Sequence, residues 1–316
     1  MGHMKPNYFN NIIFLLRTII TIIVIGLLIW FVLSNKEVIE KIRNVNIKYF
    51  IPLIIFSIID LILSGFFLKT IIKPFKIDLK EHFLISSAST FLNQIIPIRG
   101  GDAMRALYFK QKYKLNYYDY ISTVFGHLII TFFYLSSLSL VIFFIIYIRE
   151  GIFNITVNFI LITIFISCLW MVIKPVQFKK DNFITEKINY ALKGWKTIFE
   201  HKKILFSLII ISAIISINMI IKIYIVFLSL SINISILKVA YIYIIIKLVA
   251  FINITPGGLG IIEGAYLISG SILNIDPESM LALAIIIRGI NIIVIAPIGL
   301  IAYLYLINKY EFFHKN

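Results

Sequence analysis

Long apolar stretches alternate with short polar segments along this chain. A hydrocarbon core of about 30 Å needs about 20 helical residues to cross it. We therefore predict an all-α integral membrane protein with about six spanning helices. The predicted spans are residues 12–33, 50–72, 120–148, 152–173, 204–230 and 281–307.

Two further apolar regions, 82–114 and 236–274, are interrupted by proline and glycine. Proline removes a backbone donor and glycine loosens the backbone, so both breaks interrupt a helix at or near membrane depth. Unpaired backbone groups are tolerated there only inside protein or beside water. We predict that each region is a re-entrant helix pair that enters and leaves on one side. The breaks contain Pro97, Gly100 and Gly101 in the first region and Pro256, Gly257, Gly258 and Gly260 in the second.

Composition supports the membrane assignment. Hydrophobic residues make up 60% of the chain and charged residues 14%, against about 25% charged in an average soluble domain. A cytosolic enzyme, a disulfide-framed secreted module and a disordered chain are thereby excluded. With one cysteine, Cys168, the chain cannot form an internal disulfide.

The formal net charge of +15 comes mainly from Lys and Arg in the polar segments between apolar stretches. This distribution indicates positive-inside topology and contact with anionic lipid rather than nucleic acid. Cations around the first broken region and in the loop 174–203 place both in the cytoplasm. The second broken region ends in Asp276 and Glu278, which suits the outer face. Both termini are then cytoplasmic, in a multi-pass protein of the plasma membrane.

The domain organisation follows from these elements. Residues 1–4 are typical of a remnant left by an expression vector, and 5–316 form a single transmembrane domain. The loop 174–203 contains an amphipathic pattern that predicts an interfacial helix on the cytoplasmic leaflet.

The two breaks also suggest an internal repeat. The stretch from Asn93 through Pro97 to Gly101 resembles the stretch from Asn253 through Pro256 to Gly258, about half the chain later. With the topology above, units 50–148 and 204–307 are inverted relative to each other. Inverted repeats with interrupted helices at matching positions are typical of secondary transporters. Chance similarity in an Ile-rich chain is the alternative.

Charged residues inside apolar stretches need an explanation, because each costs about 2.5–3.5 kcal/mol at a helix centre on insertion scales. Asp60 lies near the middle of the span 50–72, so we predict a functional role or an interior ion pair. Arg288 lies about 10 Å into the last span, at 1.5 Å per residue, where Glu263 could pair with it or both could flank a headgroup.

Arg99, Asp102 and Arg105 flank the first break. Guanidinium groups match phosphate well, and helix N-termini at the breaks add N–H donors. Ordinary positive-inside topology explains the two arginines equally well. We predict a substrate-binding set of Asp60, Asn93, Arg99, Asp102, Arg105, Asn253, Glu263 and Arg288.

Other polar residues in the spans have simpler interpretations. Arg17, Lys222 and Lys247 have long stems that can carry their charge to the surface, so we leave them out of the site. His127 is interpreted as a hydrogen-bonded packing residue. No zinc-peptidase, phosphate-loop or serine-nucleophile motif is present, so the sequence predicts neither an enzyme nor a cofactor or metal site.

The two motifs together resemble the flippase-like transmembrane family typified by the membrane region of lysylphosphatidylglycerol synthases, which includes archaeal proteins linked to dolichol-based glycosylation. The resemblance covers nearly the whole chain. The family's first motif maps onto Pro97, Arg99, Gly101, Asp102 and Arg105, with Asp in place of Glu, and its second onto Pro256, Gly257, Gly258, Gly260, Glu263 and Arg288. The chain departs from the family at Gly126-His127, where many members have a Glu-Arg pair.

The resemblance implies movement of a phospholipid or a polyprenyl-phosphate-linked or glycolipid headgroup between leaflets. The soluble aminoacyl-transferring domain is absent, so lysyl transfer is not implied. The expected partner is a membrane lipid with an anionic, phosphate-containing headgroup. The alternative is a non-transporting partner or scaffold of a membrane glycosyltransferase or lipid synthase, and an intramembrane enzyme is disfavoured by the missing motifs.

Overall fold

A computed structural model of the chain describes residues 36–72, 77–97, 99–173, 200–252 and 255–310, together with 182, 185, 189 and 192. These residues form helices and connecting turns, with no strand among them. The all-α prediction is confirmed for this part of the chain. The predicted span 12–33, Arg17, Asn253 and most of the loop 174–203 lie outside the described residues.

Within the described part of the chain, four helices are long and apolar enough to cross a membrane: α3 (Phe50–Ile71), α6 (Tyr117–Glu150), α9 (Lys202–Ser229) and α12 (Pro277–Tyr310). They correspond to four of the six predicted spans. The helix at the predicted span 152–173, α7 (Ile155–Ile173), is apolar but shorter. The count of six spans therefore stays a prediction.

Capping residues explain where α6 and α12 begin and end. The side chain of Asn116 accepts a hydrogen bond from the Tyr118 backbone N–H, and α6 ends at Gly151, whose φ of 68° suits glycine. The carboxylate of Asp276 accepts a bond from the Ser279 N–H at 2.9 Å. Because this cap precedes the apolar run, α12 begins before the predicted residue 281.

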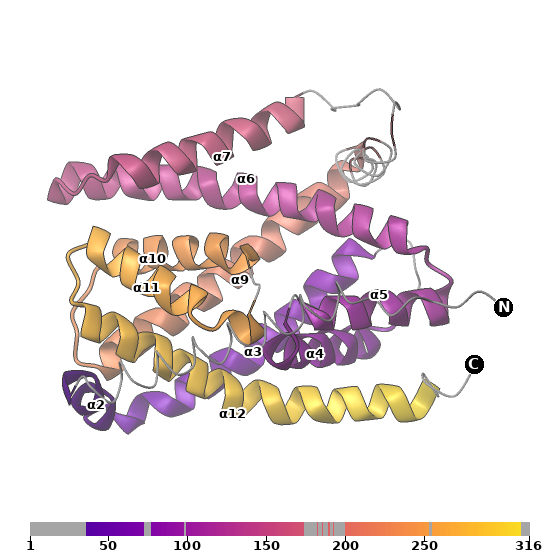
Figure 1. Cartoon of the computed structure of the whole chain (residues 1–316), viewed down its shortest axis with the longest axis horizontal. Helices are drawn as coiled ribbons and strands as arrows, with labels where there is room; N and C mark the ends of the chain where they lie inside the picture. Colours follow the sequence, from indigo (N-terminus) through magenta and orange to yellow (C-terminus); the bar gives the residue numbers. More distant parts are fainter. Residues whose placement is uncertain are drawn as a thin grey trace, which may run out of the picture.

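Two pairs of shorter helices replace the broken regions. In the first pair, α4 (Leu79–Ile95) is followed by α5 (Gly100–Tyr113). In the second, α10 (Ile236–Val249) is followed by α11 (Ile261–Ile272). The two pairs occupy opposite ends of the molecule, and the breaks lie toward its middle (Figure 1). The remaining elements are α2 (Lys36–Arg43), η1 (Ile47–Tyr49), η2 (Ala250–Ile252) and η3 (Pro256–Gly258).

The long helices hold the two short pairs together. Helix α3 packs along α9, α4 packs against α12, and α10 packs against α6. Buried Leu53, Phe227 and Tyr241 belong to the larger hydrophobic cluster, which surrounds the second pair. Tyr108 and Phe109 belong to a smaller cluster around the first pair. Each short pair therefore has a core of its own, built with the same long helices.

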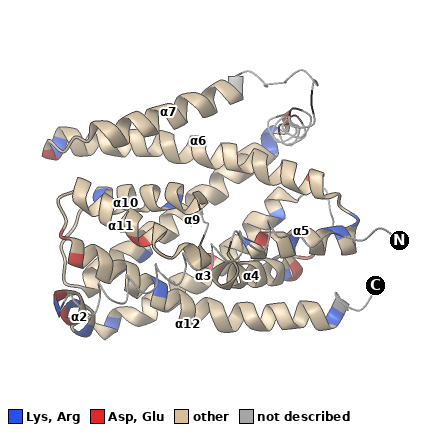
Figure 2. Cartoon of the chain, viewed as in Figure 1, with Lys and Arg blue, Asp and Glu red and all other residues tan. Residues whose placement is uncertain are grey.

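Ion pairs brace the end of the molecule where α10 and α11 lie. Lys41 of α2 pairs with Asp276, and Lys238 Nζ lies 2.6 Å from Glu150 Oε2. Partial burial raises the pKa of Asp276, but hydrogen bonds from Lys41 and Ser279 outweigh that effect and keep the pKa below its ordinary value. Figure 2 shows these charges gathered on α2 and at the helix ends.

The open end of the α4–α5 pair is braced by one carboxylate. Glu81 Oε1 accepts hydrogen bonds from the hydroxyls of Tyr108 and Tyr113 at 2.6 and 2.7 Å. Glu81 Oε2 lies 2.7 Å from Lys112 Nζ. Side chains from the last turns of α5 thus fix the first turn of α4.

Candidate functional site

The first break is held by a close approach of α5 to α4. The side-chain oxygen of Asn93 accepts a hydrogen bond from the Gly101 N–H at 2.8 Å. A Cβ at Gly101 would lie 1.9 Å from the Ser89 carbonyl oxygen, so no larger residue fits. Arg99 just before α5 has the left-handed conformation, with φ of 57°, which costs a non-glycine residue about 1–2 kcal/mol. Such strain is typical of functional positions.

The second break is held by an ion pair between α11 and α12. Arg288 Nη2 lies 2.6 Å from Glu263 Oε1 and donates to the Gly257 carbonyl at 3.3 Å. The other carboxylate oxygen accepts a bond from the Gly260 N–H at 2.8 Å. Gly257 and Gly260 both have positive φ, which glycine adopts without strain. Glu263 and Arg288 thus form the ion pair that was one of the two predicted arrangements, and it joins α11 to α12 at the second break. Their predicted part in substrate binding stays a prediction.

The two breaks touch each other. A Cβ at Gly257 would lie 3.4 Å from the Gln94 carbonyl oxygen, which is ordinary van der Waals contact. Gln94 belongs to the last turn of α4, next to the first break. We call this contact the partition; both of its residues line one of the two cavities described below, and neither lines the other.

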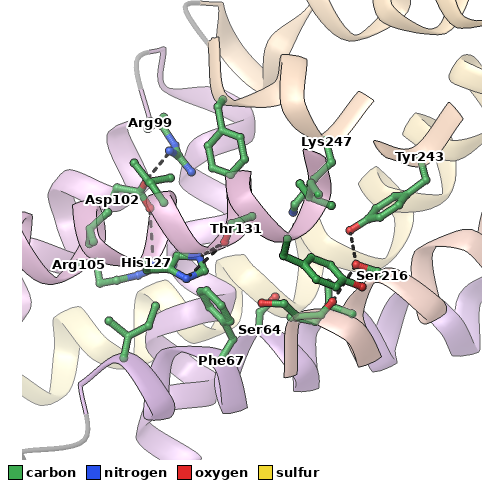
Figure 3. A pocket seen from close by; sticks show the side chains of 18 of the residues that line it. Ser64, Phe67, Arg99, Asp102, Arg105, His127, Thr131, Ser216, Tyr243 and Lys247 are labelled. Atoms are coloured by element: carbon green, nitrogen blue, oxygen red, sulfur yellow. Dashed lines mark hydrogen bonds and ion pairs between the residues drawn. The ribbon is translucent and has the colours of Figure 1, made fainter. Parts of the chain in front are cut away.

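The cavity that the partition does not line has a volume of about 190 Å³, and we call it the basic cavity (Figure 3). Asp102 lies between two arginines, with Arg99 Nε at 2.9 Å and Arg105 Nη1 at 3.7 Å from its carboxylate oxygens. Lys247 of α10 faces the same space and has no salt bridge or hydrogen bond to another described residue. The cavity lining therefore contains three cations and one carboxylate.

Part of the basic cavity wall has unsatisfied hydrogen-bond capacity. The Nε of Arg105 and the hydroxyl of Tyr120 are buried without a hydrogen-bond partner among the described residues. Arg99 lies over the ring of Phe251, 5.6 Å from its centroid. An anion in this cavity would find charged donors already held in place.

His127 also lines the basic cavity, and its neighbours agree with the predicted packing role. Its Nε2 lies 3.0 Å from Thr131 Oγ1, and its ring meets Phe67 edge to face at 4.2 Å. Because its ring already contacts the Thr131 hydroxyl and the Phe67 ring, His127 forms part of the cavity wall.

The cavity that the partition lines has a volume of about 380 Å³, and we call it the apolar cavity. Its polar side chains are Gln94, Arg288 and Asn291, and the rest of its wall is mostly aliphatic and aromatic. Arg288 therefore does not share a cavity with Arg99 and Arg105. The sequence could not predict this separation, because the order of motifs does not say which cavity a residue lines.

Asp60 forms the predicted interior ion pair. Its Oδ2 lies 3.0 Å from Lys222 Nζ, and its Oδ1 accepts a bond from the amide of Asn218. Lys222 also donates to Asn291 Oδ1 at 2.7 Å. The side chain of Lys222 is 1% exposed, so the prediction that it reaches the surface is wrong.

Lys222 and Lys247 are the polar residues that the sequence interpretation missed. The surface role predicted for Lys247 is also wrong, because its side chain faces the basic cavity (Figure 3). For Lys222 a signal was present: Asn218 lies four residues earlier, so two polar side chains share one face of an otherwise apolar helix.

The chain matches the lysylphosphatidylglycerol synthase transmembrane-region family over residues 18–299. The chain belongs to this family. The family description indicates a membrane protein with a lipid-related role. The match covers both broken pairs, three of the long helices in full and α12 as far as residue 299.

Two archaeal relatives are similar along different lengths. A UPF0104 membrane protein of Methanocaldococcus jannaschii is 25% identical over 303 residues, covering 85% of this chain and 88% of the relative. A UPF0104 membrane protein of Methanothermobacter thermautotrophicus is 27% identical over 135 residues, covering 42% of this chain and 40% of the relative. No solved structure matches the chain.

Proposed function

We propose that this protein moves a lipid with an anionic, phosphate-containing headgroup between leaflets, with the headgroup held in the basic cavity. The observation that carries the proposal is the excess of positive charge there: Arg99, Arg105 and Lys247 line the cavity together with one carboxylate, that of Asp102, which pairs with the two arginines. Uncompensated charge is costly in a membrane interior, so an anion bound in this cavity would relieve that cost. Guanidinium forks favour phosphate over a neutral headgroup.

The transport mechanism we propose is alternating access between two inverted units, α3–α6 and α9–α12. The packing supports it: exchanging the units turns the α4–α12 contact into the α10–α6 contact and keeps α3 against α9. The short pairs would re-enter the membrane from opposite faces and meet at the partition (Figure 1). Movement of one unit against the other would then open the basic cavity to each side in turn.

Reconstitution tests the proposed function. The purified protein is placed in phosphatidylcholine vesicles containing fluorescent phosphatidylglycerol, and dithionite reports the fraction of label in the outer leaflet. We expect the label of both leaflets to be reduced, and faster for phosphatidylglycerol than for a glucosylceramide with the same fluorophore. If the inner-leaflet label is reduced no faster than in protein-free vesicles, the protein does not transport this lipid, and the scaffold alternative is favoured.

Orientation is a separate part of the proposal: both termini and the α4–α5 pair face the cytoplasm of a plasma-membrane protein. In a Cys168→Ser background, Ser235→Cys lies at an exposed position before α10, and Gln111→Cys lies at an exposed position near the end of α5. We expect an impermeant maleimide to label Ser235→Cys in intact cells and Gln111→Cys only after permeabilisation. The opposite pattern would invert the topology.

A further inference from the structure

The long helices enclose a buried polar network that phosphate binding does not use. It joins Asp60 of α3, Asn218 and Lys222 of α9, and Asn291 of α12. Asn218 also donates to the Phe56 carbonyl at 3.1 Å. A buried ion pair contributes little to stability relative to well-packed apolar side chains, because desolvation of the two charges offsets their attraction. Stability alone therefore does not account for a lysine and an aspartate here.

The network lies where the two proposed units meet. Asp60 belongs to the first unit, while Lys222 and Asn291 belong to the second. Ser64, one turn after Asp60, lines the basic cavity, so the carboxylate lies close to the wall of that cavity. Any movement of α3 against α9 must carry this ion pair along or break it.

We propose that Asp60 is a proton-binding site that couples lipid movement to a proton gradient; this inference rests on the proposed function. Lys222 Nζ lies between a carboxylate oxygen at 3.0 Å and an amide oxygen at 2.7 Å, so an ammonium already occupies the place between these two oxygens. The exchangeable cation in this proposal is therefore a proton, bound by the carboxylate itself. The proton arrives through the basic cavity and binds a carboxylate oxygen of Asp60.

Charge balance links the proton to the lipid. With Asp60 ionised, the pair with Lys222 is neutral. Protonation of Asp60 leaves the ammonium uncompensated and adds one positive charge beside the basic cavity, which strengthens the binding of a phosphodiester there. Each binding event therefore favours the other, as reciprocal linkage requires. One proton and one lipid monoanion then cross together without net charge.

Other groups around Asp60 fit this arrangement. Among the described residues, the charged or titratable groups that interact with Asp60 are Lys222 of α9 and Lys247 and Tyr243 of α10. Helix α12 contributes the neutral amide of Asn291 through Lys222. Lys247 faces the basic cavity as well, so it lies between the proposed proton site and the proposed phosphate site.

The experiment measures where fluorescent phosphatidylglycerol accumulates, with the membrane potential clamped by valinomycin and potassium. A gradient of one pH unit should concentrate the lipid in the leaflet facing the alkaline side by up to about tenfold for one coupled proton. The Asp60→Asn/Lys222→Gln double variant keeps neutral polar groups at both positions and should distribute the lipid equally. Asp119→Asn, at an exposed carboxylate in the first turn of α6, should accumulate lipid as the parent does.

Each outcome separates the inference from the proposed function. No transport by the parent would overturn the function, whereas parent transport that ignores the gradient would overturn only the coupling. If the double variant accumulates lipid to the same extent as the parent, Asp60 is not the residue that couples transport to protons. If the double variant is inactive, infrared difference spectra provide the test. Addition of lipid should produce the band of a protonated carboxyl group in the parent and in Asp119→Asn, but not in Asp60→Asn. The same band in Asp60→Asn would overturn the inference.

Discussion

Replacing Arg105 and Lys247 together by glutamine is expected to slow transport of fluorescent phosphatidylglycerol at least about tenfold. Each cation would supply a charge-assisted hydrogen bond to phosphate, and such bonds contribute about 1.5–3 kcal/mol each. The two residues come from α5 and α10, so they reach the basic cavity from the two proposed units. Dithionite reduction in reconstituted vesicles measures the rate, and thermal unfolding in detergent shows whether the variant is folded.

The matched control removes the same number of charges elsewhere. Lys202→Gln/Lys203→Gln changes two exposed lysines in the first turn of α9, away from both cavities. We expect this control to transport at the parent rate. If both double variants transport like the parent, the positive charge of the basic cavity serves topology alone. If both are slow to the same degree, the net charge of the protein governs the rate.

The sequence predicted the positions of the breaks well, because proline and glycine act through the local backbone. The chain leaves helical geometry after Ile95 and again between Val249 and Ile261, close to the predicted interruptions. Glu263 and Arg288 also met as predicted, on helices that follow each other directly.

Long-range contacts could not be predicted in the same way. Asp60 was expected to have an interior partner, but Lys222 lies 162 positions away on another apolar helix. Nothing in a single sequence says which faces of two long helices meet, and a lysine stem suits the surface and the interior equally well. For the same reason the predicted single set of arginines became two groups, with Arg99 and Arg105 in one cavity and Arg288 in another.

Arg288→Ala is expected to destabilise the protein by about 3–5 kcal/mol, because it leaves the buried Glu263 carboxylate without its counter-ion. Glu263 is only 6% exposed, so water cannot replace the guanidinium. The Gly257 carbonyl would lose its donor as well. Arg288→Lys keeps the charge, but its ammonium does not reproduce the position of the Nη2 that contacts both groups, so its stability should fall between those of the parent and Arg288→Ala.

The Glu263→Gln/Arg288→Gln double variant distinguishes two causes of instability in Arg288→Ala: the unpaired charge of Glu263 and the loss of the contact between α11 and α12. It removes both charges but keeps a side chain that can accept the Gly260 N–H bond, so we expect it to unfold at a higher temperature than Arg288→Ala. Thermal unfolding in one detergent compares the variants with the parent. Equal unfolding temperatures for Arg288→Ala and the parent would show that Glu263 gains no stability from this pair. In that case the conformation of the second break would have to be maintained by its glycines and by contact with α4, since those interactions do not depend on Arg288.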